Sequence, residues 1–271
     1  MMFDPKAQWD LANLFKARFP YVYIPTWEEK RAEEFILSTA WDERLIIHPR
    51  EVYSWTQTAG FTNLSEMNRV NGTQDPMKAF AFIESCDRDA IFIMKDLHVF
   101  FGVQGRPPAY DLIRRMRDLI PVLHESQERK NIVILSPQLV IPADMEKEIS
   151  VFEFPLPNVD EMLDMLDRII RENGLDNSRL SYEDKEKLAK SALGLTAQEA
   201  ENAFSRAIVA NRGLDGNAIR VIFDEKNQVI KKTGILEFIK ANFTIDDIGG
   251  LENLKSWLGR VHIRASTMRA K

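Results

Sequence analysis

Short apolar runs alternate with amphipathic segments over the first part of the chain. The runs are Tyr21–Ile24, Leu45–Ile47, Val52–Trp55, Ile91–Met94, Ile132–Leu135 and Val151–Phe154, and we predict a strand at each. The segments Asp4–Arg18 and Asp111–Leu123, with others around Phe35 and Phe80, show helical spacing of apolar residues. Unbroken apolar runs are typical of strands buried on both faces, and their alternation with helices predicts a layered α/β fold around a parallel sheet. The polar stretch Gly60–Gly72 is predicted to be a loop.

Beyond Pro157 the pattern predicts helices only. The predicted helices are Asp160–Arg171, Ser181–Ala192, Thr196–Val209 and Gly216–Lys232. Three have favourable entry caps: Asn158 before an acidic turn, Ser181 with Asp184, and Thr196 with Glu199. We therefore predict an α/β domain over residues 1–156, a small all-helical domain over 157–232, and a connecting segment with a further helix start over 233–271.

The run Ile91–Met94 ends in a candidate site formed by Lys95, Asp96 and His98. In phosphate-hydrolysing α/β proteins this strand ends in Asp-Glu: the Asp holds Mg²⁺ through water, and the Glu polarises the attacking water. Here a cation stands at the metal position, or, if Asp96 is that residue, Leu97 follows where a carboxylate is needed. Whether Lys95 or Asp96 stands at the metal position, the strand is retained but the pair of carboxylates needed for phosphate hydrolysis is not. The simpler alternative is a strand end whose polar residues reach solvent.

The turn after the first strand, Pro25–Arg31, would carry GxxxxGK[ST] in a nucleotide-binding unit. It contains no glycine, and Glu28 and Glu29 crowd the predicted helix start, where they would repel a triphosphate. Thr26 and Glu29 have the spacing of a capping box. No Gly-Lys dipeptide occurs anywhere in the 271 residues, so the sequence predicts no phosphate loop in this chain.

Composition and charge narrow the function classes. The net charge of -5 argues against a nucleic-acid binder, and the single cysteine, Cys86, fits a reducing cytoplasm. No apolar run is long enough to span a membrane, and the four histidines and the cysteine lack metal-ligand spacing. The basic run Arg114–Arg117 is expected to be a solvated helix face rather than a binding patch. The tryptophans Trp9, Trp27, Trp41 and Trp55 are expected in the core.

Six phrases of the sequence resemble one protein family. They are ARFPYVYIPTWEE, AIFIMKDLHVFF, VILSPQLVIP, EKEISVFEFPLP, GLTAQEAENAFSRAI and IDDIGGLENLKSWL. Together they resemble the N-terminal part of the AAA ATPases of the hypothetical chloroplast reading frame forty-six family, found in cyanobacteria, plastids and other bacteria. The resemblance implies a degenerate AAA- or RecA-like domain without a phosphate loop, then a lid-like helical domain. It also implies that an active cassette using ATP and Mg²⁺ follows, with a hexamer expected for the full-length family.

Residues Asp247, Ile248 and Gly249 match positions that line the adenine pocket through backbone groups in AAA cassettes, so the resemblance makes them candidate cofactor-binding residues. The alternative is a flexible tail. The chain reaches Lys271 before any phosphate loop, acidic motif or arginine finger of that cassette.

Three hypotheses on function stay open at this point. The first is a non-catalytic module that serves oligomer assembly and binds a protein substrate or adaptor, without a cofactor of its own. The second is a fragment of an ATP-hydrolysing remodelling ATPase whose active cassette follows Lys271; on this view the chain is an enzyme only when that cassette completes it. The third is a stand-alone regulator that docks on AAA rings or phosphorylated partners.

Overall fold

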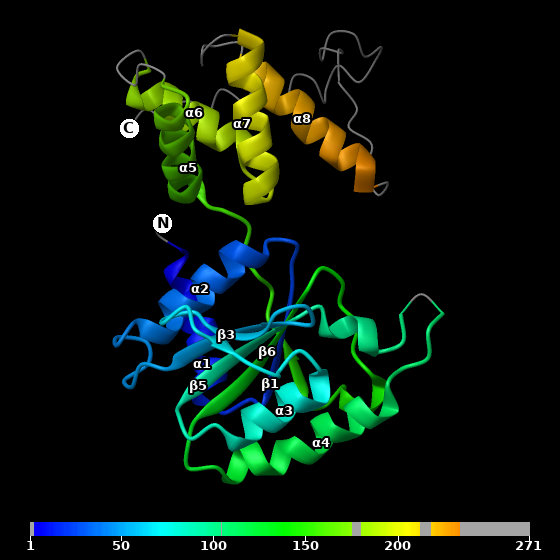
Figure 1. The fold of residues 1–271 in the computed structure, drawn as a ribbon. Helices are drawn as coiled ribbons and strands as arrows, with labels where there is room; N and C mark the ends of the chain where they lie inside the picture. Colours follow the sequence, from blue (N-terminus) through cyan, green and yellow to red (C-terminus); the bar gives the residue numbers. More distant parts are fainter. Residues whose placement is uncertain (1–2, 104, 175–179, 212–217, 234–271) are drawn as a thin grey trace, which may run out of the picture. The chain divides into compact units, whose positions relative to one another are not determined.

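The computed structural model describes residues 3–103, 105–174, 180–211 and 218–233. The chain divides into the units Met1–Phe223 and Asp224–Lys271, and each is treated by itself. The first unit holds a layered α/β part and the helices that follow it (Figure 1). In the second unit, only the end of the last helix lies within the described residues.

The elements alternate as the hydrophobic pattern predicts, first α/β and then helical. In order they are α1 (Pro5–Lys16), β1 (Tyr21–Pro25), α2 (Glu29–Trp41), β2 (Glu51–Thr56), β3 (Gly60–Asn63), β4 (Arg69–Val70), α3 (Pro76–Ser85), β5 (Ala90–Lys95), the 3-10 helix η1 (Leu97–Phe100), α4 (Tyr110–Glu125), β6 (Lys130–Ser136), the 3-10 helix η2 (Ala143–Met145), β7 (Ile149–Val151), α5 (Val159–Glu172), α6 (Tyr182–Ala192), α7 (Ala197–Asn211) and α8 (Ala218–Thr233). The predicted α/β class is confirmed.

The sheet has seven strands in the order β4-β3-β2-β5-β6-β1-β7. Strands β2, β5, β6, β1 and β7 run parallel, and β3 and β4 add an antiparallel edge. Strand β6 lies between β5 and β1, with Lys95 beside Leu135 and Pro25 beside Ser136. The carboxyl ends of β1, β5 and β6 therefore meet at one edge of the sheet.

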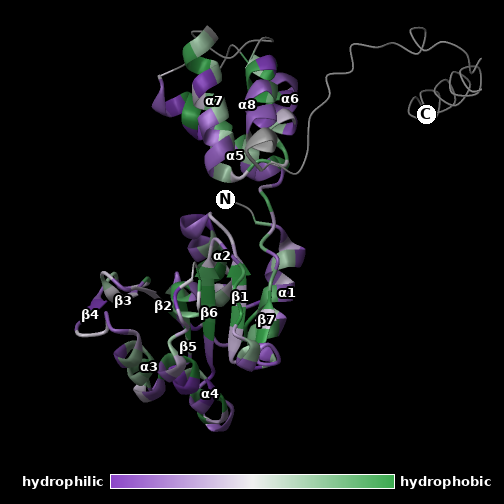
Figure 2. Ribbon diagram, turned by 90° about the vertical axis from the view of Figure 1, so that its right-hand side faces the viewer, coloured by the Kyte–Doolittle hydropathy of each residue, from purple (hydrophilic) through white to green (hydrophobic). Residues whose placement is uncertain are grey.

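Alternate residues of each central strand face opposite layers of the core. Tyr21, Tyr23, Phe92 and Met94 pack with α3 and α4, whereas Val22, Ile24, Ile91 and Ile93 pack with α1 and α2. Figure 2 shows the hydrophobic colour concentrated in the central strands of the α/β part. Both faces of the sheet are covered, which explains why the strands read as unbroken apolar runs.

Three details of the predicted α/β part are wrong. Leu45–Ile47 is not a strand: the amides of Leu45 and Ile46 donate back to Asp42 in a turn, and Ile47 is 80% exposed. Gly60–Gly72 is not merely a loop, since it contains β3 and β4. Gly60 has a left-handed φ of 75°, and a Cβ there would meet Thr73 Oγ1 at 2.6 Å, so a glycine suits the start of β3.

The third difference concerns the last strand, which is Ile149–Val151 rather than Val151–Phe154. The Phe152 amide still donates to the Tyr23 carbonyl at 2.8 Å. Beyond it the chain leaves the sheet. Phe152 stacks its ring on Phe35 of α2, and Phe154 meets the same ring edge-on. These aromatic contacts account for the apolar run that the sequence pattern assigned to a strand.

The predicted entry caps of α5, α6 and α7 are confirmed. Asn158 and Glu161 form a reciprocal capping box at α5, with bonds of 2.9 and 3.0 Å. The Ser181 hydroxyl accepts the Asp184 amide, and the Thr196 hydroxyl accepts the Glu199 amide. Among the described residues, no helix is both long and apolar enough to cross a membrane.

Candidate functional site

The candidate site lies at the carboxyl edge of the sheet, where β1, β6 and β5 end side by side. The Thr26 amide donates to the Ser136 carbonyl at 2.8 Å, and the Asp96 amide donates to the Leu135 carbonyl at 2.9 Å. The turn into α2 and the Lys95–Asp96 corner thus flank the end of β6. In open α/β sheets this is the edge at which ligands bind.

The turn into α2 is built by Thr26 rather than by glycines. The Thr26 hydroxyl accepts the Glu28 amide at 3.1 Å, and Glu28 is the residue before the helix. The predicted capping box between Thr26 and Glu29 is wrong, because α2 has no side-chain cap. The Glu29 carboxylate instead turns toward β5.

Lys95, the last residue of β5, is neutralised by two carboxylates of α2. Its Nζ lies 2.9 Å from Glu33 Oε1 and 3.2 Å from Glu29 Oε2. The Ser54 hydroxyl of β2 also donates to the Glu33 carboxylate. Burial on its own lowers the pKa of the Lys95 ammonium, but the hydrogen bonds and charges of Glu33 and Glu29 raise the pKa above its ordinary value. The ammonium therefore stays charged and paired.

This ion pair does not include Asp96 or His98, which lie close to one another. Asp96 has a left-handed φ of 55° and an exposed side chain, and Leu97 behind it is buried. His98 is buried, and its Nδ1 lies 3.8 Å from Asp96 Oδ1, too far for a hydrogen bond. The structure thus separates the predicted trio into a Lys95 ion pair and a distinct Asp96–His98 corner.

A second charged cluster, which the sequence pattern did not indicate, is buried where the start of α2 meets the start of α5. We call Glu28, Arg31 and Glu161 the Arg31 cluster. The Arg31 guanidinium lies 3.1 Å from Glu28 Oε2 and 2.9 Å from Glu161 Oε1, and the three side chains are at most 6% exposed. It also donates to the Pro155 carbonyl at 2.8 Å and lies 4.6 Å from the Phe154 ring centroid. Only the spacing of Glu28 and Arg31 was visible in the sequence, since Glu161 is 130 residues away from Arg31.

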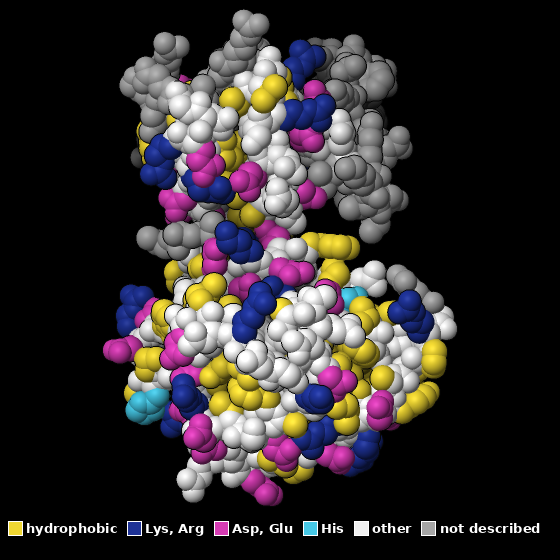
Figure 3. Space-filling view, viewed as in Figure 1, with side chains coloured by type: hydrophobic (Ala, Val, Ile, Leu, Met, Phe, Trp, Pro, Cys, Tyr) yellow, Lys and Arg dark blue, Asp and Glu magenta, His cyan; other side chains and the backbone are white. Residues whose placement is uncertain are grey.

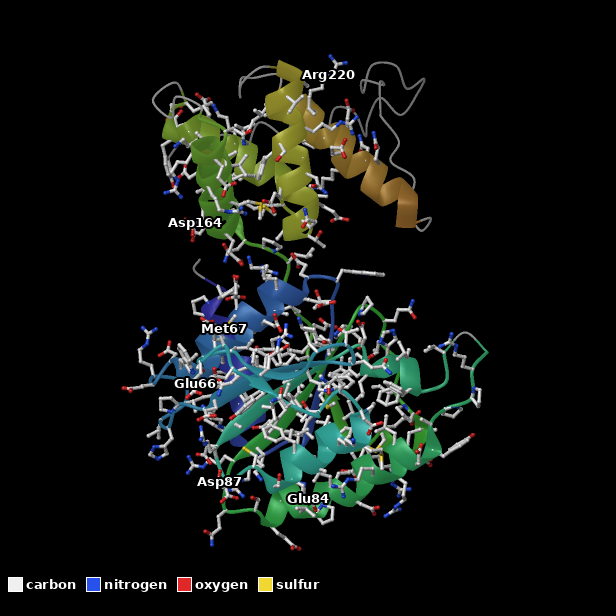
Figure 4. The ribbon with its side chains drawn as sticks, in the orientation of Figure 1. Glu66, Met67, Glu84, Asp87, Asp164 and Arg220 are labelled. Atoms are coloured by element: carbon white, nitrogen blue, oxygen red, sulfur yellow. The ribbon has the colours of Figure 1, made fainter. Side chains whose placement is uncertain are left out.

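The other candidates divide between surface residues and the core. Arg114 pairs with Asp118 on α4, and Arg115 pairs with Glu84 of α3, which Figure 4 labels. Positive and negative side chains are interspersed over the face drawn in Figure 3, so no block of positive charge stands out there. Arg114 and Arg117 are exposed and Arg115 is partly exposed, so the basic run is a solvated helix face, as expected.

The tryptophan prediction is wrong for three of the four residues. Trp9, Trp27 and Trp41 are 56%, 75% and 48% exposed, and only Trp55 is in the core. The exposed three lie on α1, in the turn into α2 and at the end of α2, which are outer positions of their elements. The residues Asp247, Ile248 and Gly249 lie outside the described residues, so their role stays a prediction.

The ammonium of Lys95 at this edge is already paired and is surrounded by carboxylates. An incoming phosphate would have to break the Lys95 pairs and approach Glu28, Glu29 and Glu33. The described residues contain no group of three His, Cys, Asp or Glu side chains able to hold a metal ion. The geometry supports internal charge pairing.

The sheet order and the helices after it define a layered α/β module followed by a helical part. The similar solved structures include a chain of the E. coli MS115-1 HORMA:CdnC:Trip13 complex, with a TM-score of 0.51 and 11% identity, covering 82% of this chain and 87% of that one. This likeness concerns the fold alone.

The family follows from two sequence profiles. Residues 7–154 match the N-terminal domain of SpoVK-like AAA ATPases and residues 160–233 match the second domain, so the chain belongs to this family. It is 32% identical to the AAA domain-containing protein ycf46 of Guillardia theta and 30% identical to that of Trieres chinensis. Each alignment covers 92% of this chain and 46% or 47% of the relative, so the chain spans about half the length of these relatives. The resemblance drawn from the six phrases is confirmed.

Proposed function

We propose that this chain is a non-catalytic AAA-like module that serves oligomer assembly and binds a protein substrate or adaptor for an ATPase cassette. The observation that carries the proposal is the Lys95 ion pair with Glu29 and Glu33. In working phosphate-binding units the helix after the first strand brings a cation and the central strand brings a carboxylate. Here the two charges are exchanged between the helix and the strand.

The exchange matters because the Lys95 ammonium is already paired with Glu29 and Glu33 and is not available to a phosphate. The exchanged charges satisfy one another directly, so no metal or phosphate is needed to bridge the helix and the strand. The Ser54 hydroxyl also bonds to Glu33 rather than facing an open site. The module accordingly needs no cofactor of its own, whereas ATP and Mg²⁺ belong to the cassette of the longer family members.

A protein-binding role is supported by Trp27, which is 75% exposed in the turn at the same edge. Exposing a tryptophan ring to water is unfavourable, and tryptophan is common at the centre of protein interfaces. Assembly, up to the hexamer expected for the family, and a cytoplasmic location belong to the same proposal. The low content of cysteine and the net charge of -5 support a cytoplasmic protein that does not bind nucleic acid.

We further propose a boundary near Leu156 between the α/β domain of residues 1–156 and a lid-like domain of residues 157–232. Residues 233–271 would connect to a cassette. The two profile matches, which end at residue 154 and begin at residue 160, support this boundary.

The second candidate is a fragment of an ATP-hydrolysing AAA ATPase, in which Asp247, Ile248 and Gly249 contribute to an adenine pocket. It is supported by the length of the ycf46 relatives, of which this chain spans about half. On this view too the chain hydrolyses no ATP without the cassette, so the two candidates differ in whether the chain by itself assembles.

Light scattering on the chain separates them, and an ATP hydrolysis assay tests the non-catalytic role. We expect self-association that Trp27→Ala weakens and that the matched variant Trp41→Ala leaves unchanged, with no hydrolysis above buffer. Hydrolysis that disappears in Lys95→Ala would contradict the non-catalytic role. A monomer at all concentrations would contradict the assembly role.

A further inference from the structure

The Arg31 cluster joins α2 to the first residues of both α5 and α7, and the proposed function makes no use of it. Glu161 is the third residue of α5 and closes its capping box through the Asn158 amide at 3.0 Å. The same carboxylate accepts from Arg31 Nε at 3.0 Å. Arg31 therefore holds the residue that starts α5.

Glu28 makes the corresponding connection to α7. Its Oε1 accepts the Ala197 amide at 2.5 Å, and its Oε2 accepts from Arg31 at 3.1 Å. Ala197 is the first residue of α7, where the backbone amides have no partner within the helix. Helix N-termini bind anions through such amides, and here the anion is a side chain of the chain itself.

The side chains of the cluster are buried, and the Arg31 guanidinium donates to both carboxylates of the cluster and to a backbone carbonyl. This carbonyl belongs to Pro155, which lies in the segment leading from β7 to α5. The Phe154 ring covers the guanidinium face at 4.6 Å, and the Phe3 ring centroid lies 6.0 Å from it. A buried charge with several directed hydrogen bonds fixes one geometry, because any displacement leaves a charge unpaired.

We propose that the Arg31 cluster is an internal latch that holds the starts of α5 and α7 on α2 without any ligand. Glu28 supplies the negative charge that a bound phosphate supplies at the helix N-termini of nucleotide-binding proteins. The helices of the first unit are then held in one arrangement at all times, instead of closing and opening with nucleotide. This inference rests on residues other than the Lys95 pair, so it can fail while the proposed function stands.

Amide hydrogen exchange on the whole chain tests the latch. In Glu28→Gln the side chain keeps its shape and loses its charge, and we expect the amides of Ala197 to Ala200 to exchange at least about tenfold faster. Amides of β5 and β6 should keep their rates. The matched variant Glu29→Gln, whose carboxylate contacts Lys95 instead, should leave α7 at the wild-type rate.

Two results would overturn the latch. One is an α7 exchange rate in Glu28→Gln within twofold of the wild type. The other is an equal acceleration of strands and helices, which would make the cluster a general core element. If Glu28→Gln does not fold, Ala197→Pro replaces it, because proline is well tolerated at the first helical position and removes only the donor. Gln198 to Ala200 should then exchange faster, and unchanged rates there would equally overturn the proposal.

Discussion

Residues 28–33 at the start of α2 take part in two charged clusters, one completed by Glu161 and the other by Lys95, and the clusters differ in burial. The Arg31 cluster has side chains at most 6% exposed, whereas the Lys95 pair includes Glu29, whose side chain is 46% exposed. Buried ions must be paired, because an uncompensated charge in the interior is costly, while partly exposed ions keep water as an alternative partner. The start of α2 therefore has two roles. Its buried charges contact the starts of α5 and α7, and its partly exposed carboxylates neutralise Lys95 at the end of β5.

The largest expected effect comes from breaking the buried cluster. Arg31→Met should lower the free energy of unfolding by about 3–5 kcal/mol, because Glu28 and Glu161 are then left buried without a counter-ion. Denaturant unfolding followed by circular dichroism measures it. Arg44→Met is the matched control, since Arg44 is exposed and pairs only locally with Asp42, and it should unfold like the wild type. A similar stability for both variants would show that the Arg31 cluster does not stabilise the fold.

The partly exposed pair should matter less. Lys95→Met should lower the free energy of unfolding by about 1–2 kcal/mol at neutral pH, with Glu33 losing its closest cation. The exposed Lys30 of the same helix provides the control variant Lys30→Met.

The pH dependence of the same variant has a definite sign. Because the folded-state pKa of Lys95 is raised above the ordinary value of 10.5, its contribution is complete below that pH and is lost as the pH rises through the folded pKa. The stability difference between wild type and Lys95→Met should therefore shrink in alkaline solution. A difference that grows with alkaline pH would mean that the pair does not stabilise the fold.

The link between the buried cluster and α5 can be measured through the cap. Asn158→Ala should cost about 1 kcal/mol, the usual value of a helix N-cap. Because Glu161 belongs to both the capping box and the Arg31 cluster, the losses in Asn158→Ala and Arg31→Met should not add in the double variant. Ser181→Ala, at the exposed cap of α6, should add to Arg31→Met without coupling. Additivity in both pairs would show that the cap and the cluster are independent.

The smallest expected effect is at Trp27. This residue is 75% exposed, so Trp27→Ala should change the free energy of unfolding by no more than about 0.5 kcal/mol. Chemical denaturation of the variant under dilute conditions checks this. A loss of several kcal/mol would mean that Trp27 supports the fold and is not a surface available to partners.

The central strands and the helical caps could be predicted because their signals are local. Ile91–Met94 and Ile132–Leu135 are buried on both faces, so their apolar runs are unbroken, and the Asn158, Ser181 and Thr196 caps follow from residues three positions apart. The edge strands β3 and β4 could not be predicted in the same way, because their pairing is decided by β2 and by the turn at Gly60.

The candidate site was predictable only in part. The sequence singled out Lys95 and noted Glu29 but not Glu33, and it did not indicate that both carboxylates contact Lys95. Which residue of a helix faces a given strand depends on how the helix packs on the sheet. The Arg31 cluster could not be predicted either, because Glu161 is 130 residues away from Arg31 and only the tertiary fold brings the two together.

The central claim is that the charges at the carboxyl edge of the sheet satisfy one another and leave no place for nucleotide. The most direct test is calorimetric titration of ATP with Mg²⁺ into the 271-residue chain, with Lys95→Ala alongside. We predict no heat of binding up to millimolar ATP in either protein. Micromolar binding to the wild type that is lost in Lys95→Ala would contradict the claim, because Lys95 would then be holding a phosphate rather than Glu29 and Glu33.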